Sequence, residues 1–370
     1  MRAFPCVIMR GGTSKGAFFK AEDIPADKVA RDAFLLDVMG SPDARQIDGL
    51  GGANSLTSKV AIIGKSQRDD ADVDYTFAQV SITDSLVDTK GNCGNISSAV
   101  GPYAVNEKFV DAKDGMTSVR IYNTNTQKII ISTFAVKDGM AVEKGELEIP
   151  GVPGCGASIE VTFSDPEGAV TNKLLPTDKS IDTITTSFGQ IPISIVDAGN
   201  PLVFMKASDL GLKGTELSSE FDEAKLARIE EVRSIAAELC GFCAKEDATK
   251  QSPAVPKATV IEIPKAYSDM KKRAWTEQSY DISLRMMSMQ KPHQALAVTG
   301  AVCVTFASKV EGSLVHEITK NAQGDLRIGH PGGVMQTKYY DDGTKKGVTV
   351  LRTARLIMKG VVYTKNDFKL

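Results

Sequence analysis

The feature that most constrains the fold is an internal repeat that spans half of the 370-residue chain. The segment 11–24 reads GGTSKGAFFKAEDI, and the segment 197–210 reads DAGNPLVFMKASDL. An offset of 186 residues aligns Phe18 with Phe204, Lys20 with Lys206, Ala21 with Ala207 and Asp23 with Asp209. A period this long indicates two copies of one structural unit. We therefore predict two domains, residues 1–185 and residues 186–370, each long enough to bury its own core.

Both copies show the same order of predicted elements around the repeat. In each, an apolar strand (4–9 or 191–196) is followed by a turn of small residues, a second strand, and an Asp-Ile or Asp-Leu pair that predicts a helix start. A weaker match aligns 92–105 with 291–303, where each segment predicts an apolar helix after a strand.

Short strands outnumber long helices elsewhere in the chain. Apolar patterns predict strands at 59–63, 75–82, 118–122, 128–136 and 158–163. The clearest long amphipathic helix is predicted at about 219–240, where apolar residues recur at helical spacing. This balance favours an α+β fold over a doubly wound α/β sheet.

Composition limits the classes of partner. The 44 Lys and Arg and 46 Asp and Glu residues are interspersed and give a net charge of -2, so we expect neither a nucleic-acid nor a membrane partner. No apolar run approaches the roughly 18 residues that span a bilayer, and the N-terminal segment lacks the apolar core of a secretion signal. Six cysteines, some in apolar stretches, predict reduced thiols and a cytoplasmic location. Whether the protein forms a homo-oligomer is left open.

The segment Asn92-Cys93-Gly94-Asn95-Ile96-Ser97-Ser98 is the sharpest local signal, because a cysteine precedes the start of an apolar helix. The N–H groups at a helix N-terminus lower the pKa of a thiol and bind anions. One turn would then hold an ionisable thiol and a substrate carboxylate. An inert cysteine in a capping turn explains the same residues.

Two cationic residues are candidates for a different reason. Lys59 begins an apolar strand, where desolvation would make it a usable base if it faces a cavity. Arg285 lies in a methionine-rich strand and suits bidentate binding of a carboxylate if it faces a cleft. A solvated position at a strand explains either residue equally well.

The remaining motifs carry less information. The turn 11–16 fails the phosphate-loop pattern, but its glycines, with Thr13 and Ser14, expose N–H groups and hydroxyls that a carboxylate needs; a tight turn without a ligand is the alternative. The C-x-x-C pair at 240–243 ends a helix and lacks a second pair. The three histidines lie far apart, so we expect no metal site. The turn at 329–333 either approaches a ligand or is purely structural.

Taken together, five motifs resemble the PrpF family, which groups methylaconitate isomerases, methylitaconate delta-isomerases, oxalomesaconate tautomerases and aconitate isomerases. The resemblance covers essentially the whole chain. The motifs are MRGGTSKG at 9–16, RQIDGLGG at 45–52, TSKVA at 57–61, GNCGNIS at 91–97 and GHPG at 329–332. Within the family, the stretch 70–80 favours the methylitaconate branch.

The resemblance implies a diaminopimelate epimerase-like fold, in which each of two α+β halves wraps a sheet around a central helix and the active site lies in the cleft between them. In the epimerases, a cysteine from each half acts as base or acid. Here the matching helix start in the second half is expected at Lys291-Pro292-His293-Gln294, which has no cysteine. A mechanism with two thiols is therefore in doubt.

The resemblance instead implies that Lys59 is the main base of a cofactor-independent 1,3-proton shift and that Cys93 assists as an acid. The expected anchors for the substrate's carboxylates are Ser14, Asn92, Gly94, Asn95 and Arg285. The expected partner is a small unsaturated polycarboxylate such as methylitaconate, with methylaconitate, aconitate and oxalomesaconate as alternatives. Two rival functions stay open: a racemase or epimerase that uses Cys93 with His293, and a non-catalytic polycarboxylate-binding protein.

Overall fold

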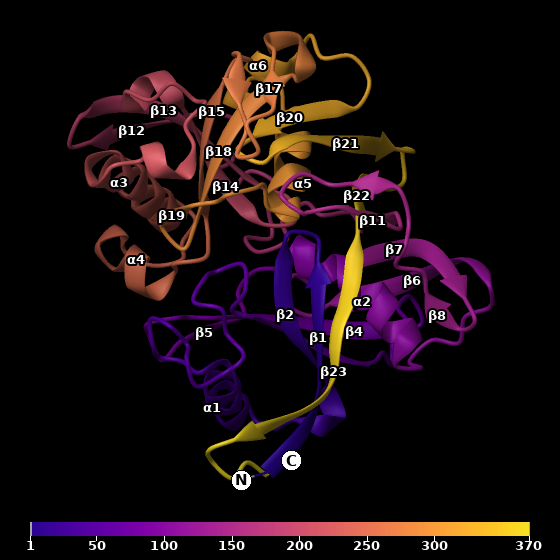
Figure 1. Cartoon of the computed structure of the whole chain (residues 1–370). Helices are drawn as coiled ribbons and strands as arrows, with labels where there is room; N and C mark the ends of the chain where they lie inside the picture. Colours follow the sequence, from indigo (N-terminus) through magenta and orange to yellow (C-terminus); the bar gives the residue numbers. More distant parts are fainter. Residues whose placement is uncertain (1, 370) are drawn as a thin grey trace. The chain divides into compact units, whose positions relative to one another are not determined.

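The computed structural model describes residues 2–369, which form two compact units. Unit 1 comprises Met1–Thr162 and Leu351–Leu370, and unit 2 comprises Phe163–Val350. These bounds differ from the halves 1–185 and 186–370, because the last long strand, β23 (Ala354–Thr364), pairs antiparallel with β1 (Arg2–Gly11) of unit 1. Figure 1 shows the yellow β23 beside the indigo β1. The division into equal halves stays a prediction from the repeat.

Unit 1 is a sheet wrapped around one helix, α2 (Gly94–Asn106), which contacts β1, β2, β3, β4, β6, β7, β8 and β23. Every residue of α2 from Gly94 to Val105 is buried, since its small side chains let strands approach on all sides. The other elements of the unit are β2 (Ser14–Lys20), η1 (Ala21–Asp23), α1 (Lys28–Met39), β3 (Lys59–Lys65), β4 (Val73–Val80), β5 (Val87–Asp88), β6 (Gly115–Asn123), β7 (Lys128–Lys137), β8 (Met140–Ala141), β9 (Leu147–Glu148) and β10 (Cys155–Gly156). The strand β11 (Ile159–Ser164) crosses into unit 2.

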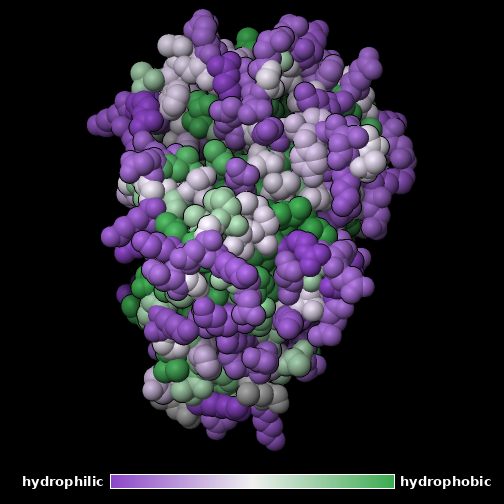
Figure 2. All heavy atoms as spheres, turned by 90° about the vertical axis from the view of Figure 1, so that its right-hand side faces the viewer, coloured by the Kyte–Doolittle hydropathy of each residue, from purple (hydrophilic) through white to green (hydrophobic). Residues whose placement is uncertain are grey.

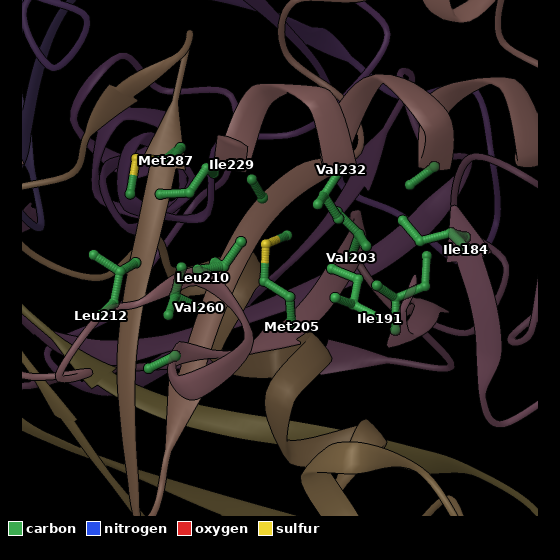
Figure 3. Packing of buried hydrophobic residues seen from close by; sticks show 14 of the residues in the cluster. Ile184, Ile191, Val203, Met205, Leu210, Leu212, Ile229, Val232, Val260 and Met287 are labelled. Carbon is green, nitrogen blue, oxygen red and sulfur yellow. The ribbon is translucent and has the colours of Figure 1, made fainter. Parts of the chain in front are cut away.

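Unit 2 has its own central helix, α5 (Val298–Ala307), all of whose residues are buried. A second apolar layer packs α3 (Glu223–Leu239) on the sheet through Ile229 and Val232 (Figure 3). The other elements are β12 (Asp182–Thr186), β13 (Gly189–Asp197), β14 (Pro201–Lys206), η2 (Ala207–Leu210), η3 (Ser218–Glu220), η4 (Lys245–Asp247), α4 (Ala248–Gln251), β15 (Lys257–Glu262), β16 (Tyr267–Ser268), β17 (Ala274–Trp275), η5 (Glu277–Ser279), β18 (Ile282–Ser288), β19 (Lys291–Pro292), α6 (Leu314–Thr319), β20 (Leu326–His330) and β21 (Gly333–Asp341). The strand β22 (Lys346–Arg352) crosses back into unit 1.

The two units share one sequence of strand pairings. In unit 1, β1, β2, β3, β4, β6 and β7 pair in this order as antiparallel, parallel, antiparallel, parallel and antiparallel neighbours. In unit 2, β13, β14, β15, β18, β20 and β21 pair in the same alternation. The register also agrees with the 186-residue offset, since Ala17 pairs with Val60 and its counterpart Val203 pairs with Ala258. The structural repeat therefore matches the sequence repeat.

The prediction of an α+β fold is confirmed, and the predicted strands correspond to β1, β3, β4, β6, β7, β11 and β13. The amphipathic helix is α3, although Leu239 at its end is exposed and Ala236 is buried in its place. The Asp-Ile and Asp-Leu pairs mark single 3-10 turns, η1 and η2, rather than long helices.

One expectation about the second half was wrong. The central helix of unit 2 begins at Val298, with Ala297 as its N-cap, and not near Lys291. Lys291 instead belongs to β19, which forms a tight hairpin with β18 across Met289 and Gln290, both at positive φ. Because neither of these residues is glycine or asparagine, the sequence carries no sign of the turn.

The surface agrees with the interspersed charges of the sequence. On the face shown in Figure 2, hydrophilic side chains are spread over the surface with hydrophobic ones between them. Among residues 2–369, no helix is long and apolar enough to cross a membrane.

Candidate active site

The glycine-rich turn between β1 and β2 lies directly on the first turn of α2. A Cβ atom added to Gly11 would meet the backbone oxygen of Asn95 at 2.4 Å, and one added to Gly12, which has φ of +51°, would meet Asn95 Oδ1 at 2.2 Å. The Thr13 N–H donates to the same Oδ1 at 3.3 Å. The glycines therefore serve close packing of the turn against the helix, with Asn95 as the link.

The same turn also contacts the segment that leads into β3. The Lys15 N–H donates to the Leu56 carbonyl at 2.9 Å. A Cβ atom added to Gly16 would lie 2.8 Å from the Lys59 carbonyl oxygen and 3.2 Å from Ile96 Cδ1 of α2. Gly16 thus sits between the start of β3 and the start of α2. The turn therefore packs its backbone against both the start of β3 and the first turn of α2.

Cys93 is the N-cap of α2 and has extended backbone angles, as a cap requires. Its side chain does not cap the helix; its carbonyl accepts the Ser97 N–H at 2.9 Å and the Ser97 hydroxyl at 3.0 Å. The Cys93 side chain is partly exposed, whereas Asn92 and Asn95 are buried. The predicted helix start at Cys93 is correct, and the thiol lies at the positive end of the helix dipole.

Two hydroxyl groups of the turn are left without hydrogen bonds inside the described chain. Ser14 Oγ and Thr13 Oγ1 are both buried and unpartnered there, and Ser14 as a whole is 2% exposed. Buried hydroxyls are almost always satisfied in folded proteins. Their position on the turn that packs on the N-terminus of α2 suits donation to the oxygens of an anionic ligand. The sequence indicated Thr13 only as part of the glycine-rich turn and not as a separate anchor for a carboxylate.

Lys59 is buried at the first position of β3, with 5% of its surface exposed. Its Nζ donates to Gln79 Oε1 at 2.5 Å and lies 5.1 Å from the centre of the Phe77 ring. Both partners come from β4, because the antiparallel β3–β4 register places Lys59 opposite Gln79. Gln79 was not identified from the sequence. The one available signal was a polar residue near the end of the apolar run 75–82, and its partner depends on the register.

Tyr75, also on β4, is fully buried. Burial raises the pKa of the Tyr75 hydroxyl well above its ordinary value, and the negative charge of a Cys93 thiolate would raise it further. Tyr75 is therefore neutral at physiological pH.

Arg285 belongs to β18 of unit 2 and is 1% exposed. Its Nε donates to the Glu216 carbonyl at 2.6 Å and its Nη1 to the Leu284 carbonyl at 2.7 Å, while Nη2 is buried without a hydrogen bond to the described residues. Burial lowers the pKa of Arg285, and the nearby Tyr267 opposes that effect. The predicted anchoring role of Arg285 stays a prediction.

The three weaker candidates are Cys240, whose thiol is largely buried, and His293 and His330, whose rings accept local hydrogen bonds. Burial raises the pKa of the Cys240 thiol to about 12, which makes it a poor nucleophile. His293 Nδ1 accepts the Ala295 N–H at 3.0 Å, and His330 Nδ1 accepts the Gly332 N–H at 3.1 Å. In residues 2–369, no group of three or more His, Cys, Asp and Glu side chains is arranged to hold a metal ion.

Relatives of known description cover nearly the whole chain. YraM of Bacillus subtilis (strain 168) is 54% identical over 363 residues, covering 98% of each chain. The 3-methylitaconate isomerase of Eubacterium barkeri is 45% identical over 368 residues, covering 98% of this chain and 97% of the relative. The crystal structure of a methylitaconate-delta-isomerase matches with a TM-score of 0.81 and 44% identity, covering 98% of this chain and 96% of that one.

More distant structures share the fold alone. A hydroxyproline epimerase from Agrobacterium vitis matches with a TM-score of 0.55 at 11% identity, which supports the predicted epimerase-like architecture. The prediction that the chain is an isomerase is confirmed by the named relatives. A sequence model of the family described as PrpF protein matches residues 1–365, so the chain belongs to the PrpF family.

Proposed function

We propose that this protein moves a double bond in a small unsaturated polycarboxylate, with methylitaconate as the first candidate substrate, by a cofactor-independent 1,3-proton shift. The observation that carries the proposal is the buried amine of Lys59 in the same part of unit 1 as two unpartnered hydroxyls and a helix N-terminus. This combination supplies a base and a set of donors for carboxylate oxygens.

Lys59 removes the proton from the allylic carbon, and the electron pair of that C–H bond enters the conjugated system to give a dienolate. A proton returns to the carbon two positions away, so that the double bond moves and no electron or atom is lost. Cys93 at the start of α2 assists as the acid. In its neutral form the Lys59 amine takes the proton, and as an ammonium it stabilises the negative intermediate.

The substrate's carboxylates are held by the turn and by the helix start. Ser14 donates its free hydroxyl, and the backbone N–H groups of Gly94 and Asn95 belong to the first turn of α2, where the helix dipole favours negative charge. The Asn92 amide is the further anchor in unit 1. The methylitaconate relatives favour this acid over methylaconitate, aconitate and oxalomesaconate.

A racemase mechanism with one thiol from each half has less support from the pairing of the two units. The counterpart of Cys93, the N-cap of the central helix in unit 2, is Ala297. A mechanism with one thiol from each half would need a cysteine at that position.

Incubation of the enzyme with each of the four acids in D2O, followed by NMR, tests the proposal. We expect deuterium at the allylic carbon and a shifted double bond with at least one acid. Lys59→Met should abolish exchange, whereas Lys65→Met, at the exposed other end of β3, should leave it unchanged. Tight binding of the acids without exchange would instead identify a binding protein, and exchange that survives Lys59→Met would overturn Lys59 as base.

The cysteine usage supports a cytoplasmic location for this reaction. Cell fractionation followed by immunoblotting tests that location independently of the chemistry.

A further inference from the structure

We infer that Gln79 is a positioning residue for Lys59: it holds the amine in place through an uncharged acceptor. This inference rests on the proposed role of Lys59 as the base. Gln79 is 6% exposed and lies on β4, directly opposite Lys59 in the β3–β4 ladder.

The orientation of the Gln79 amide is fixed by its neighbours. Its Nε2 donates to the Ser58 carbonyl at 2.9 Å and to the Ser55 carbonyl at 3.2 Å. Carbonyl oxygens only accept hydrogen bonds, so the NH2 group must face them. The Oε1 atom is thereby turned toward Lys59 Nζ, 2.5 Å away. A flipped amide would leave two carbonyls facing an oxygen and Lys59 facing a second donor.

The backbone at Ser58, which carries one of these carbonyls, is itself held by further hydrogen bonds. The Ser58 hydroxyl donates to the Val80 carbonyl at 2.8 Å, and the Val80 N–H donates to the Ser58 carbonyl at 3.2 Å. The Gln46 Nε2 donates to Ser58 Oγ at 2.7 Å. With both ends of the amide held and Lys59 buried, the Nζ atom has one well-defined position, which is what proton transfer from a bound substrate requires.

The neutrality of the acceptor matters as much as its position. A carboxylate in place of the amide would stabilise the ammonium form and oppose its loss of a proton, whereas an amide oxygen carries no net charge. Within residues 2–369, no carboxylate forms an ion pair with Lys59. The titratable groups on the elements that pack against β3 are Lys15 and Lys20 on β2, Glu22 and Asp23 on η1, Asp74 and Tyr75 on β4, and Cys93 and Tyr103 at α2. Asp74 lies at the far end of β4, where it accepts the Ser66 hydroxyl.

The test is the pH dependence of kcat/KM for the isomerisation, followed in wild type, Gln79→Glu and Gln79→Met. In Gln79→Glu the new carboxylate favours the ammonium, so the acidic limb of the profile should move to higher pH by about 1 unit or more. In Gln79→Met, which has similar volume and no strong acceptor, kcat should fall about tenfold or more with little change in KM. A residue that only supports the fold would change unfolding midpoints without either effect.

Asn123→Asp is the matched control, because Asn123 is also a buried amide bound at both ends, to the Tyr75 carbonyl through Nδ2 at 3.3 Å and to the Thr126 N–H through Oδ1 at 3.0 Å, and it does not contact Lys59. It should leave the acidic limb in place. The inference is overturned if Gln79→Glu leaves the limb where wild type has it, or if Asn123→Asp moves it equally. If Gln79→Glu does not fold, Gln79→Met decides alone, and an unchanged kcat refutes the inference.

The activity of Lys59→Met separates this inference from the proposed function. If Lys59→Met retains the wild-type rate, Lys59 is not the base and the proposed function fails. If Lys59→Met is inactive and the Gln79 variants keep the wild-type profile and kcat, only the role of Gln79 is lost.

Discussion

Replacing Gly12 by alanine tests how tightly the glycine-rich turn is fitted to α2. Two costs add. Gly12 has φ of +51°, where an alanine costs about 1–2 kcal/mol more than glycine. The new Cβ would also lie 2.2 Å from Asn95 Oδ1, so the buried Asn95 side chain must move and lose its bond from the Thr13 N–H, which costs about 1 kcal/mol. We expect Gly12→Ala to lower the free energy of unfolding by about 2–3 kcal/mol.

Urea unfolding followed by fluorescence and circular dichroism measures this loss, and Gly154→Ala supplies the matched control. Gly154 lies in a loop of unit 1 at φ of +73°, with no atom within 4 Å of an added Cβ. Its replacement should therefore show only the backbone cost, about 1–2 kcal/mol. The difference between the two variants is the cost of displacing Asn95.

A double-mutant cycle with Asn95→Ala isolates that contact. Once the amide is absent, Gly12→Ala should cost only the backbone part, so the coupling energy between the two positions should be about 1 kcal/mol. The reasoning is refuted if Gly12→Ala is no more destabilising than Gly154→Ala, or if the Asn95→Ala background leaves its cost unchanged. The exchange assay on the same variants shows whether the fit also matters for catalysis.

Three further predictions concern reactivity, acid stability and capping. Iodoacetamide at pH 8 should label the exposed Cys155 and the partly exposed Cys93 and Cys243, and saturating substrate should protect Cys93 alone; equal protection of all three thiols would argue against a carboxylate site at α2. The pKa of Asp342 is lowered from about 3.8 to about 2, chiefly by the Thr344 hydroxyl, so its contribution to stability is present above about pH 4 and is lost as pH falls toward 2; Asp342→Asn should flatten the stability profile in that window, and an unchanged slope would contradict this. Ser313→Ala removes the N-cap bond to the His316 N–H and should cost about 1–2 kcal/mol in urea unfolding, whereas a loss below about 0.3 kcal/mol would show that the cap is replaced.

The sequence predicts the fold well where the signal is local. The repeat at offset 186 reappears as one alternation of strand pairings in both units, because the apolar strands and small-residue turns that define the pattern lie close together in sequence. Pairing between strands that lie far apart in the sequence has no such local signal. The strand β23 pairs with β1 across more than 340 residues, and no local pattern marks its partner. The domain bounds inferred from the repeat therefore differ from the compact units.

Part of the candidate site lies beyond what sequence patterns can reach. Cys93 could be placed at a helix start because its neighbours are small and the apolar run after it is continuous. Gln79 could not be assigned to Lys59, because their pairing depends on the register of a ladder closed by a long turn, and a shift of one residue would turn Gln79 to the opposite face. The hairpin before α5 was missed for another reason, because Met289 and Gln290 have positive φ at its turn and neither is glycine or asparagine.

The likeness of the two units sharpens the functional assignment. The register gives Lys59 a counterpart in Lys257, which also begins its strand and donates its Nζ to the Ala254 carbonyl at 3.0 Å. Phe77 and Met286 are equivalent in the two ladders, so the position of Gln79 is taken by Ser288, and the N-cap position of Cys93 is taken by Ala297. The side chain of a serine is too short to reach the lysine amine as Gln79 does, and the side chain of an alanine has no acidic group. Only in unit 1, therefore, does the shared scaffold combine the lysine with a long neutral acceptor and a thiol at the helix start.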